Sequence, residues 1–179
     1  MFDSKSDINA DLKDVWNRTS MSYAAEGGYE AVVKLLLTRD EVAADSQDMH
    51  GRTPLLYAAM EGHEAVVKLL LAQDEVAADS QDRYGQTPLS CAAMEGHEAV
   101  VKLLLARDEV AADSRDEGGR TPLSYAAEGG CEAVIKLLLA RDEVAADSQD
   151  EDGRTPLLFS AKEVHDYNIS DSYDIFFGF

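Results

Sequence analysis

Apolar residues recur at helical spacing in a stretch that appears four times along the chain. The stretch reads Glu-Ala-Val-Val/Ile-Lys-Leu-Leu-Leu and begins at Glu30, Glu64, Glu98 and Glu132. In the second copy, Val66, Val67, Leu70 and Leu71 form an i, i+1, i+4, i+5 stripe, and Lys68 falls on the other side. This pattern predicts a helix with one buried face, and the leading glutamate suits the positive end of its dipole.

A shorter segment with helical spacing precedes each of these stretches. Thr53 can cap a helix, and Pro54 suits the first turn because proline lacks the N–H that would have no partner there. Ala58 and Ala59 follow on one face, and Gly62 can end the helix in the left-handed conformation. Each unit therefore predicts a short helix, a turn and a second helix.

The unit repeats every 34 residues. Its Thr-Pro pairs stand at 53–54, 87–88, 121–122 and 155–156, with Thr19-Ser20 in the same place one period earlier. An acidic loop, Asp-Glu-Val-Ala-Ala-Asp-Ser-x-Asp, begins at Asp40, Asp74, Asp108 and Asp142. Two residues before each Thr-Pro pair stands a glycine where a tight turn needs a positive φ, at Gly51, Gly85, Gly119 and Gly153. One unit cannot bury its apolar stripe alone but stacked units can, which predicts a solenoid.

The motifs resemble the ankyrin-repeat family over roughly residues 7–163. The resemblance rests on Gly-x-Thr-Pro-Leu (51–55, 85–89, 119–123, 153–157), the Ala-Ala pair, Gly-His-Glu-Ala-Val-Val (62–67, 96–101) and the leucine-rich second helix. It implies an all-α solenoid of stacked helix–turn–helix units with short β-turn fingers. The Arg-Asp-Glu-Val loop of this 34-residue unit resembles arrays common in filamentous fungi.

The period divides the chain into six segments. These are a partial upstream repeat loop (1–18), repeats 1 to 4 (19–52, 53–86, 87–120, 121–154) and a degenerate C-terminal repeat with a tail (155–179). The chain thus begins in mid-repeat, which indicates a fragment of a longer array or a gene that has lost its upstream part. In the tail, Ile169, Tyr173, Phe176 and Phe177 suit a shifted capping helix, and disorder of residues 164–179 is the alternative.

The sequence departs from the family pattern at the residue after Thr-Pro-Leu, where the family usually has histidine. This chain has Ser22, Leu56, Ser90, Ser124 and Leu158 there. The hydrogen bonds of that histidine must therefore be absent or replaced. The usual glycine after the second helix is missing as well.

The composition of the chain limits the class of binding partner and the cellular compartment that we expect. The formal net charge is −19, and a chain this acidic repels nucleic acid and anionic membrane surfaces. A protein partner with a basic patch is the interpretation that charge favours. The two cysteines, Cys91 and Cys131, give no sign of a disulfide framework, so we expect an intracellular protein, in cytoplasm or nucleus. We also expect the chain to be a monomer. No apolar run is long enough to span a membrane.

Repeats that are otherwise nearly identical differ at the tips of the turns. The family resemblance implies binding through these tips and the inner face of the first helices. Trp, Tyr, Met and Arg are the residue types that anchor interfaces. The candidate protein-binding strip consists of Trp16, Met49, His50, Arg83 and Tyr84, with Tyr57, Met60 and Met94 behind them. Alternatively, the tips vary freely where packing does not restrain them, and Tyr57 is a packing residue.

The residues give little support for catalysis or for binding of a metal or cofactor. His63 and His97 sit at the turn between helices, which is a structural position in the family, and Cys131 stands in that place in the fourth repeat. The segment 147–153 suggests a calcium loop, but Phe159 stands where a bidentate glutamate is required. We therefore predict no catalytic residue, no metal and no cofactor. The predicted function is a protein–protein interaction scaffold and not an enzyme; a structural spacer within a larger protein is the alternative.

Overall fold

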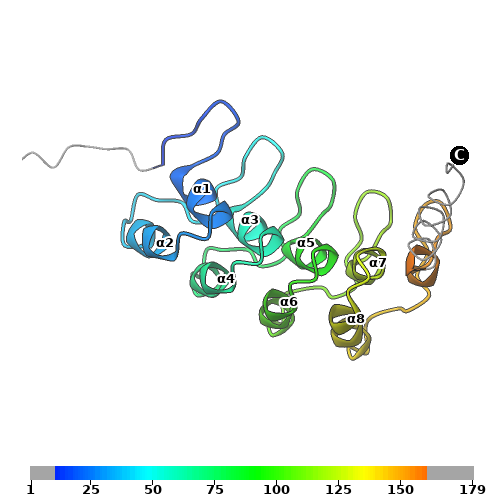
Figure 1. Ribbon diagram of the computed structural model, residues 1–179. Coiled ribbons are helices and arrows are strands. Elements are labelled where there is room, and N and C mark those ends of the chain that lie inside the picture. Colours follow the sequence, from blue (N-terminus) through cyan, green and yellow to red (C-terminus); the bar gives the residue numbers. More distant parts are fainter. Residues whose placement is uncertain (1–10, 161–179) are drawn as a thin grey trace, which may run out of the picture.

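Two rows of helices lie side by side in the computed structural model, which describes residues 11–160. Its helices are α1 (Ser20–Glu26), α2 (Glu30–Leu37), α3 (Pro54–Met60), α4 (Glu64–Leu71), α5 (Pro88–Met94), α6 (Glu98–Leu105), α7 (Pro122–Glu128) and α8 (Glu132–Leu139). Residues 156–160 are helical as well. The odd-numbered helices form one row and the even-numbered helices the other, with a long loop between successive pairs (Figure 1). This arrangement confirms the predicted all-α helix–turn–helix solenoid.

The inner row, α1, α3, α5 and α7, begins as the threonines predict. The Thr53 side chain accepts a hydrogen bond from the amide of Leu56, and Thr19, Thr87 and Thr121 cap their helices in the same way. At Thr87 a second bond completes a capping box, because Ser90 Oγ accepts from the Thr87 amide at 2.9 Å. Serine thus supplies part of the polar contact expected of the missing histidine, whereas Leu56 is simply buried.

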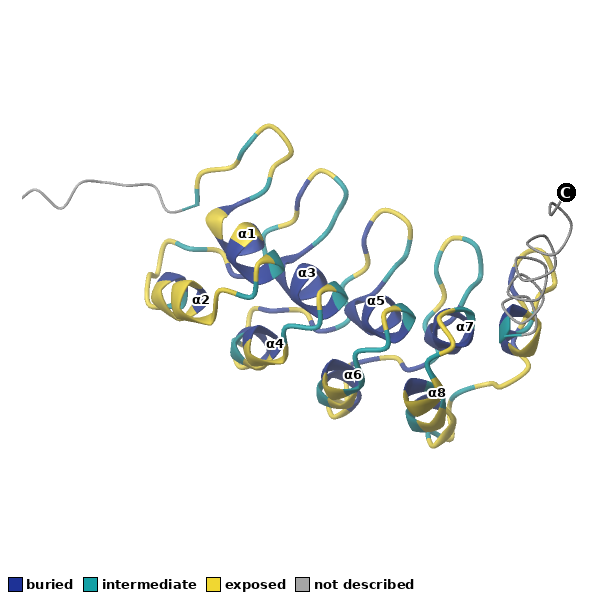
Figure 2. Ribbon diagram, in the orientation of Figure 1, coloured by how far each residue is buried: buried dark blue, intermediate teal, exposed yellow. Residues whose placement is uncertain are grey.

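The core lies between the two rows, where the second-helix stripe meets the small residues of the inner helices. Ala58, Ala59 and Val67 are fully buried, and Figure 2 shows the inner helices α3, α5 and α7 almost wholly in the buried colour. Val66 is 1% exposed, whereas Val32, at the same position of an identical helix sequence, is 44% exposed because no described repeat precedes it. Stacking therefore buries this face of the helix, as the solenoid argument requires.

Glycines shape the two turns of each unit. Gly62, after α3, has φ +73°, and a Cβ there would lie 2.5 Å from Nδ1 of His97 in the next repeat. Gly51, before Thr53, has φ +78°, as predicted for the tight turn. In the first repeat Asn17 occupies this second position at φ 61°, which asparagine tolerates better than most residues.

Successive repeats are joined at the turn that follows each inner helix. His63 Nε2 lies 2.8 Å from the carbonyl oxygen of Glu26, and His97 Nε2 lies 2.9 Å from that of Met60. The sulfur of Cys131, in the equivalent place, lies 3.7 Å from the carbonyl oxygen of Met94 and 3.2 Å from that of Gly129. The prediction that these histidines are structural therefore agrees with their bonds.

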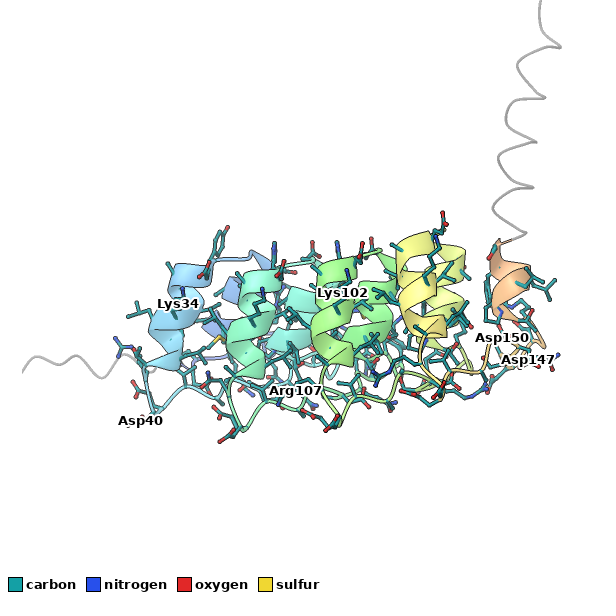
Figure 3. All side chains as sticks on the ribbon, turned by 90° about the horizontal axis from the view of Figure 1, so that it is seen from below. Lys34, Asp40, Lys102, Arg107, Asp147 and Asp150 are labelled. Atoms are coloured by element: carbon teal, nitrogen blue, oxygen red, sulfur yellow. The ribbon has the colours of Figure 1, made fainter. Side chains whose placement is uncertain are left out.

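The acidic loops that follow the outer helices are linked in series by one aspartate each. Asp45 Oδ2 accepts from the amide of Ala77 at 3.3 Å, and Asp79 Oδ2 accepts from that of Ala111 at 3.2 Å. Partial burial raises the pKa of both carboxyls, although these bonds oppose it. Asp40, Arg107 and Asp147 mark this edge in Figure 3, apart from Lys34 and Lys102 on the outer helices. The predictions for residues 1–10 and for the tail beyond Ser160 lie outside the described residues.

Candidate functional site

The loop before each inner helix folds into a finger around one aspartate. In the second finger (residues 48–52), Asp48 Oδ1 accepts from the amides of His50 and Arg52, at 2.7 and 2.9 Å. Asp48 Oδ2 accepts from the hydroxyl of Tyr57 on α3 at 2.7 Å. Burial raises the pKa of Asp48, but these bonds outweigh it and hold the pKa below the ordinary 3.8. Asp48 therefore fixes both the shape of the finger and its attachment to the helix.

The same aspartate–tyrosine pair forms in the first and fourth units but not in the third. Tyr23 and Tyr125 donate to Asp14 and Asp116, whereas Cys91 stands in the tyrosine position above Asp82. The buried Oδ2 of Asp82 has no hydrogen-bond partner, and its nearest cation is Arg52 Nε at 3.7 Å. Burial also raises the pKa of the Cys91 thiol to about 12, so the thiol stays protonated at neutral pH. One buried carboxylate oxygen thus lacks the hydroxyl that its counterparts receive.

Restoring the tyrosine should strengthen the third unit. We expect Cys91→Tyr to raise the free energy of unfolding by about 1 kcal/mol, because its hydroxyl can donate to Asp82 as Tyr57 donates to Asp48. Cys91→Phe adds the same ring without the donor, so it should give no comparable gain. Urea unfolding followed by circular dichroism measures both; equal midpoints for the two variants would contradict the hydrogen-bond explanation.

The fingers are bonded to one another through their main chains. The amide of Met49 donates to the carbonyl of Trp16 at 2.9 Å, and the amide of Arg83 donates to that of His50 at 2.8 Å. Arg83 Nη1 also lies 3.1 Å from Nδ1 of His50. These bonds make the tips a continuous edge while leaving the side chains at the surface, where Figure 2 shows the exposed and intermediate colours.

A cleft of about 290 Å³ lies between the first and second fingers. Its lining includes Trp16, Arg18, Tyr23, His50, Arg52 and Tyr57. Asp48 also lines it, but both oxygens of that carboxylate already accept hydrogen bonds. Indole, imidazole and guanidinium groups thus contribute hydrogen-bond donors to the cleft.

The structure brings only part of the predicted strip together. Trp16, His50 and Tyr57 share the cleft, and Arg83 joins them through its contact with His50. Tyr57 itself is buried, with its hydroxyl engaged by Asp48. The remaining members do not line the cleft: Met49 and Tyr84 lie on finger tips, and Met60 and Met94 are the last residues of α3 and α5.

Two arginines of the cleft were not recognised from the sequence. Arg18 stacks on the rings of Tyr23 and Tyr57, 4.0 and 4.6 Å from their centroids, and forms an ion pair with Glu26 at the end of α1. Arg52 stands in the same place of the next repeat. The signal was present in the sequence, because this arginine and the glutamate eight residues later occur together in repeats 1 and 4.

Arg120 and Glu128 form the matching ion pair in repeat 4, where the guanidinium lies over Tyr125 and Phe159. We call this arrangement, arginine before the inner helix and glutamate at its end, the arginine–glutamate clasp. In each clasp the guanidinium lies over a tyrosine ring, that of Tyr23 in repeat 1 and that of Tyr125 in repeat 4. The fingers and the inner helices together form the concave face of the stack.

Comparison with known families decides what this stack is. A family profile described as ankyrin repeats (3 copies) matches residues 2–79, 21–116, 74–149 and 109–170. The chain belongs to the ankyrin-repeat family. Ankyrin repeats are generally protein–protein interaction modules, and the family is typically not catalytic. No curated protein matches the chain. Within residues 11–160, this ankyrin array has no helix long and apolar enough to cross a membrane.

Proposed function

We propose that this ankyrin array is a recognition scaffold that binds a protein partner through its fingers and concave face. The observation that carries the proposal is the exposure of large side chains on fixed fingers. Trp16 is 55% exposed, Met49 47% and Tyr84 49%, although the backbone of each finger is hydrogen-bonded to its neighbour. Such groups lose little conformational freedom on binding and bury much apolar area, which suits an interface anchor.

The middle of the opposite face, on α4 and α6, supports this choice by contrast, although α2 and α8 at the ends expose Leu35 and Leu139. On the outer helices, Lys68 and Lys102 form i, i+4 ion pairs with Glu64 and Glu98, and all four side chains are well exposed. Pairs of this kind contribute little energy and present no apolar anchor. Figure 3 shows Lys34 and Lys102 on these helices, away from the loop edge marked by Asp40 and Asp147.

The charge and the composition of the chain support further proposals about its partner, its oligomeric state and its compartment. The net charge of −19 favours a partner that carries a basic patch, because complementary fields speed encounter. We further propose that the chain is a monomer without catalytic activity. Two free cysteines, one of them buried, suit a reducing intracellular compartment. The fungal type of the array remains a prediction from the loop motif.

Removing the two aromatic anchors should abolish partner capture. In affinity capture from cell extract with mass spectrometry, we expect at least one protein with the wild-type chain and none of it with Trp16→Ala/Tyr84→Ala. Both side chains lie on exposed finger tips, and the inter-finger bonds use the main chain, so helicity should be unchanged.

Lys68→Ala/Lys102→Ala is the matched control, because it removes two exposed side chains from the opposite face. Capture should survive in this control. Equal capture by the wild type and the finger variant would contradict the proposed site. No specific capture by any of the three would instead favour a structural spacer.

A further inference from the structure

Repeats 2 and 3 lack the arginine–glutamate clasp that is present in repeats 1 and 4. The glutamate position at the end of the inner helix holds Met60 in repeat 2 and Met94 in repeat 3. Repeat 2 keeps its arginine, Arg52, whereas repeat 3 has Gln86 in that place. Because the four units are otherwise nearly identical, these substitutions single out the centre of the concave face.

The loss of the clasp changes the environment of Arg52. The side chains of Arg18 and Arg120, which are clasped, are 16% and 20% exposed, whereas that of Arg52 is 31% exposed. The ion pair of Arg52 is a long contact, 3.7 Å from its Nε to the fully buried side chain of Asp82. Arg52 therefore faces the surface with no glutamate across its helix, at the border of the cleft that Trp16 and His50 also line.

The two carboxylates near this cation lie below the surface, so the exposed part of Arg52 can meet an anion there. The carboxylates behind it, Asp48 and Asp82, are buried, and Asp48 accepts three hydrogen bonds from the chain itself. Met60 and Met94, which end α3 and α5, are partly exposed and present apolar, adaptable surface. Beyond the methionines, Glu61 and Glu95 are exposed and would repel a second acid there.

We propose that the centre of the concave face binds an acidic–apolar peptide segment of the partner, with one carboxylate side chain at Arg52 and apolar side chains over Met60 and Met94. This inference rests on the proposed function and names the chemistry of its site. In the complex, the partner's carboxylate takes the place that Glu26 and Glu128 occupy in the clasped repeats. A partner can be basic overall and still supply this single acid.

The clasp itself supplies the test, because Met60→Glu recreates it beside Arg52. The new glutamate should pair with Arg52 as Glu26 pairs with Arg18, and so compete with the peptide without disturbing the fold. Met60→Gln is the matched control, since it has the same shape without the charge. Unfolding midpoints within the error of the wild type would establish that both variants fold.

The probe is a printed array of heptapeptides with leucine and phenylalanine flanking a central Glu, Gln or Lys. The fluorescently labelled full chain should retain the Glu peptides roughly tenfold better than the Lys peptides, since a paired carboxylate and guanidinium replace two like charges. Met60→Glu should remove this preference, and Met60→Gln should keep it.

Equal losses in the two variants would overturn the inference, because the added charge would then not be the cause. Preference of the wild type for Lys or Gln peptides would also overturn it, while leaving the recognition scaffold intact. The absence of any retained peptide, in a chain that still captures a partner through its fingers, would likewise overturn the inference alone. Failure of capture and array together would reject both proposals.

Discussion

Replacing Leu104 by alanine should destabilise the array by about 3 kcal/mol, since the truncation leaves a cavity in a site that has no access to water. Leu104 is fully buried on α6 and belongs to the core between the two rows of helices. Because each repeat contacts only its neighbours, a loss of this size weakens both the third unit and its two interfaces. Chemical unfolding followed by circular dichroism should show a clear fall in the midpoint.

Leu35→Ala is the control for this substitution. Leu35 lies on α2, whose sequence is identical to that of α6, but it is 59% exposed. Both variants exchange leucine for alanine in the same helix sequence, so their helix propensities change alike. We expect Leu35→Ala to stay within about 0.5 kcal/mol of the wild type. Similar costs at the two sites would show that burial of Leu104 between the two rows is not what stabilises the array.

Asp48→Ala should cost about 2–4 kcal/mol at neutral pH, because it removes the acceptor of two backbone amides and one tyrosine hydroxyl. The amides of His50 and Arg52 and the hydroxyl of Tyr57 would all lose their partner. The second finger would lose its shape as well as its anchor on α3. Urea unfolding of the wild type and the variant measures the difference.

The pH dependence of this difference has a definite sign. The pKa of Asp48 is held below 3.8 in the folded chain, so ionised Asp48 contributes stability above that pH and loses it as the pH falls. The gap between the wild type and Asp48→Ala should therefore be smaller at about pH 3 than at pH 7. Glu117→Ala, on an exposed finger tip, should show little effect at either pH. A gap that is constant across this range would contradict the role of the ionised carboxylate.

The sequence was sufficient for the repeat and its local structure. Thr53 and Pro54 predicted the start of α3, Gly62 predicted its end, and the apolar stripe predicted the buried face of α4. These features depend on residues within one helical turn of each other, where spacing is informative. The periodicity then predicted the stacking, because an identical stripe in every unit must be buried by a neighbour.

The contacts that shape the site span longer distances and different repeats. Tyr57 donates to a residue nine positions earlier, and His63 contacts a carbonyl 37 positions earlier. The sequence alone does not predict Arg52 as a site residue, because the surroundings of its side chain depend on Met60 at the other end of α3. Only the positions of the helices show that these two residues occupy the places of a clasp. The joint occurrence of arginine and glutamate in repeats 1 and 4 was the one sequence signal for it.

We propose that the fingers and the concave face form the binding surface of the array. The affinity of a captured partner tests this proposal most directly. The dissociation constant should be measured for the wild type, Trp16→Ala/Tyr84→Ala and the opposite-face control Lys68→Ala/Lys102→Ala. We predict that the finger variant binds roughly 100-fold or more weakly, as expected for two interface anchors, and that the control matches the wild type. A finger variant with wild-type affinity, or a control that loses binding, would contradict this account.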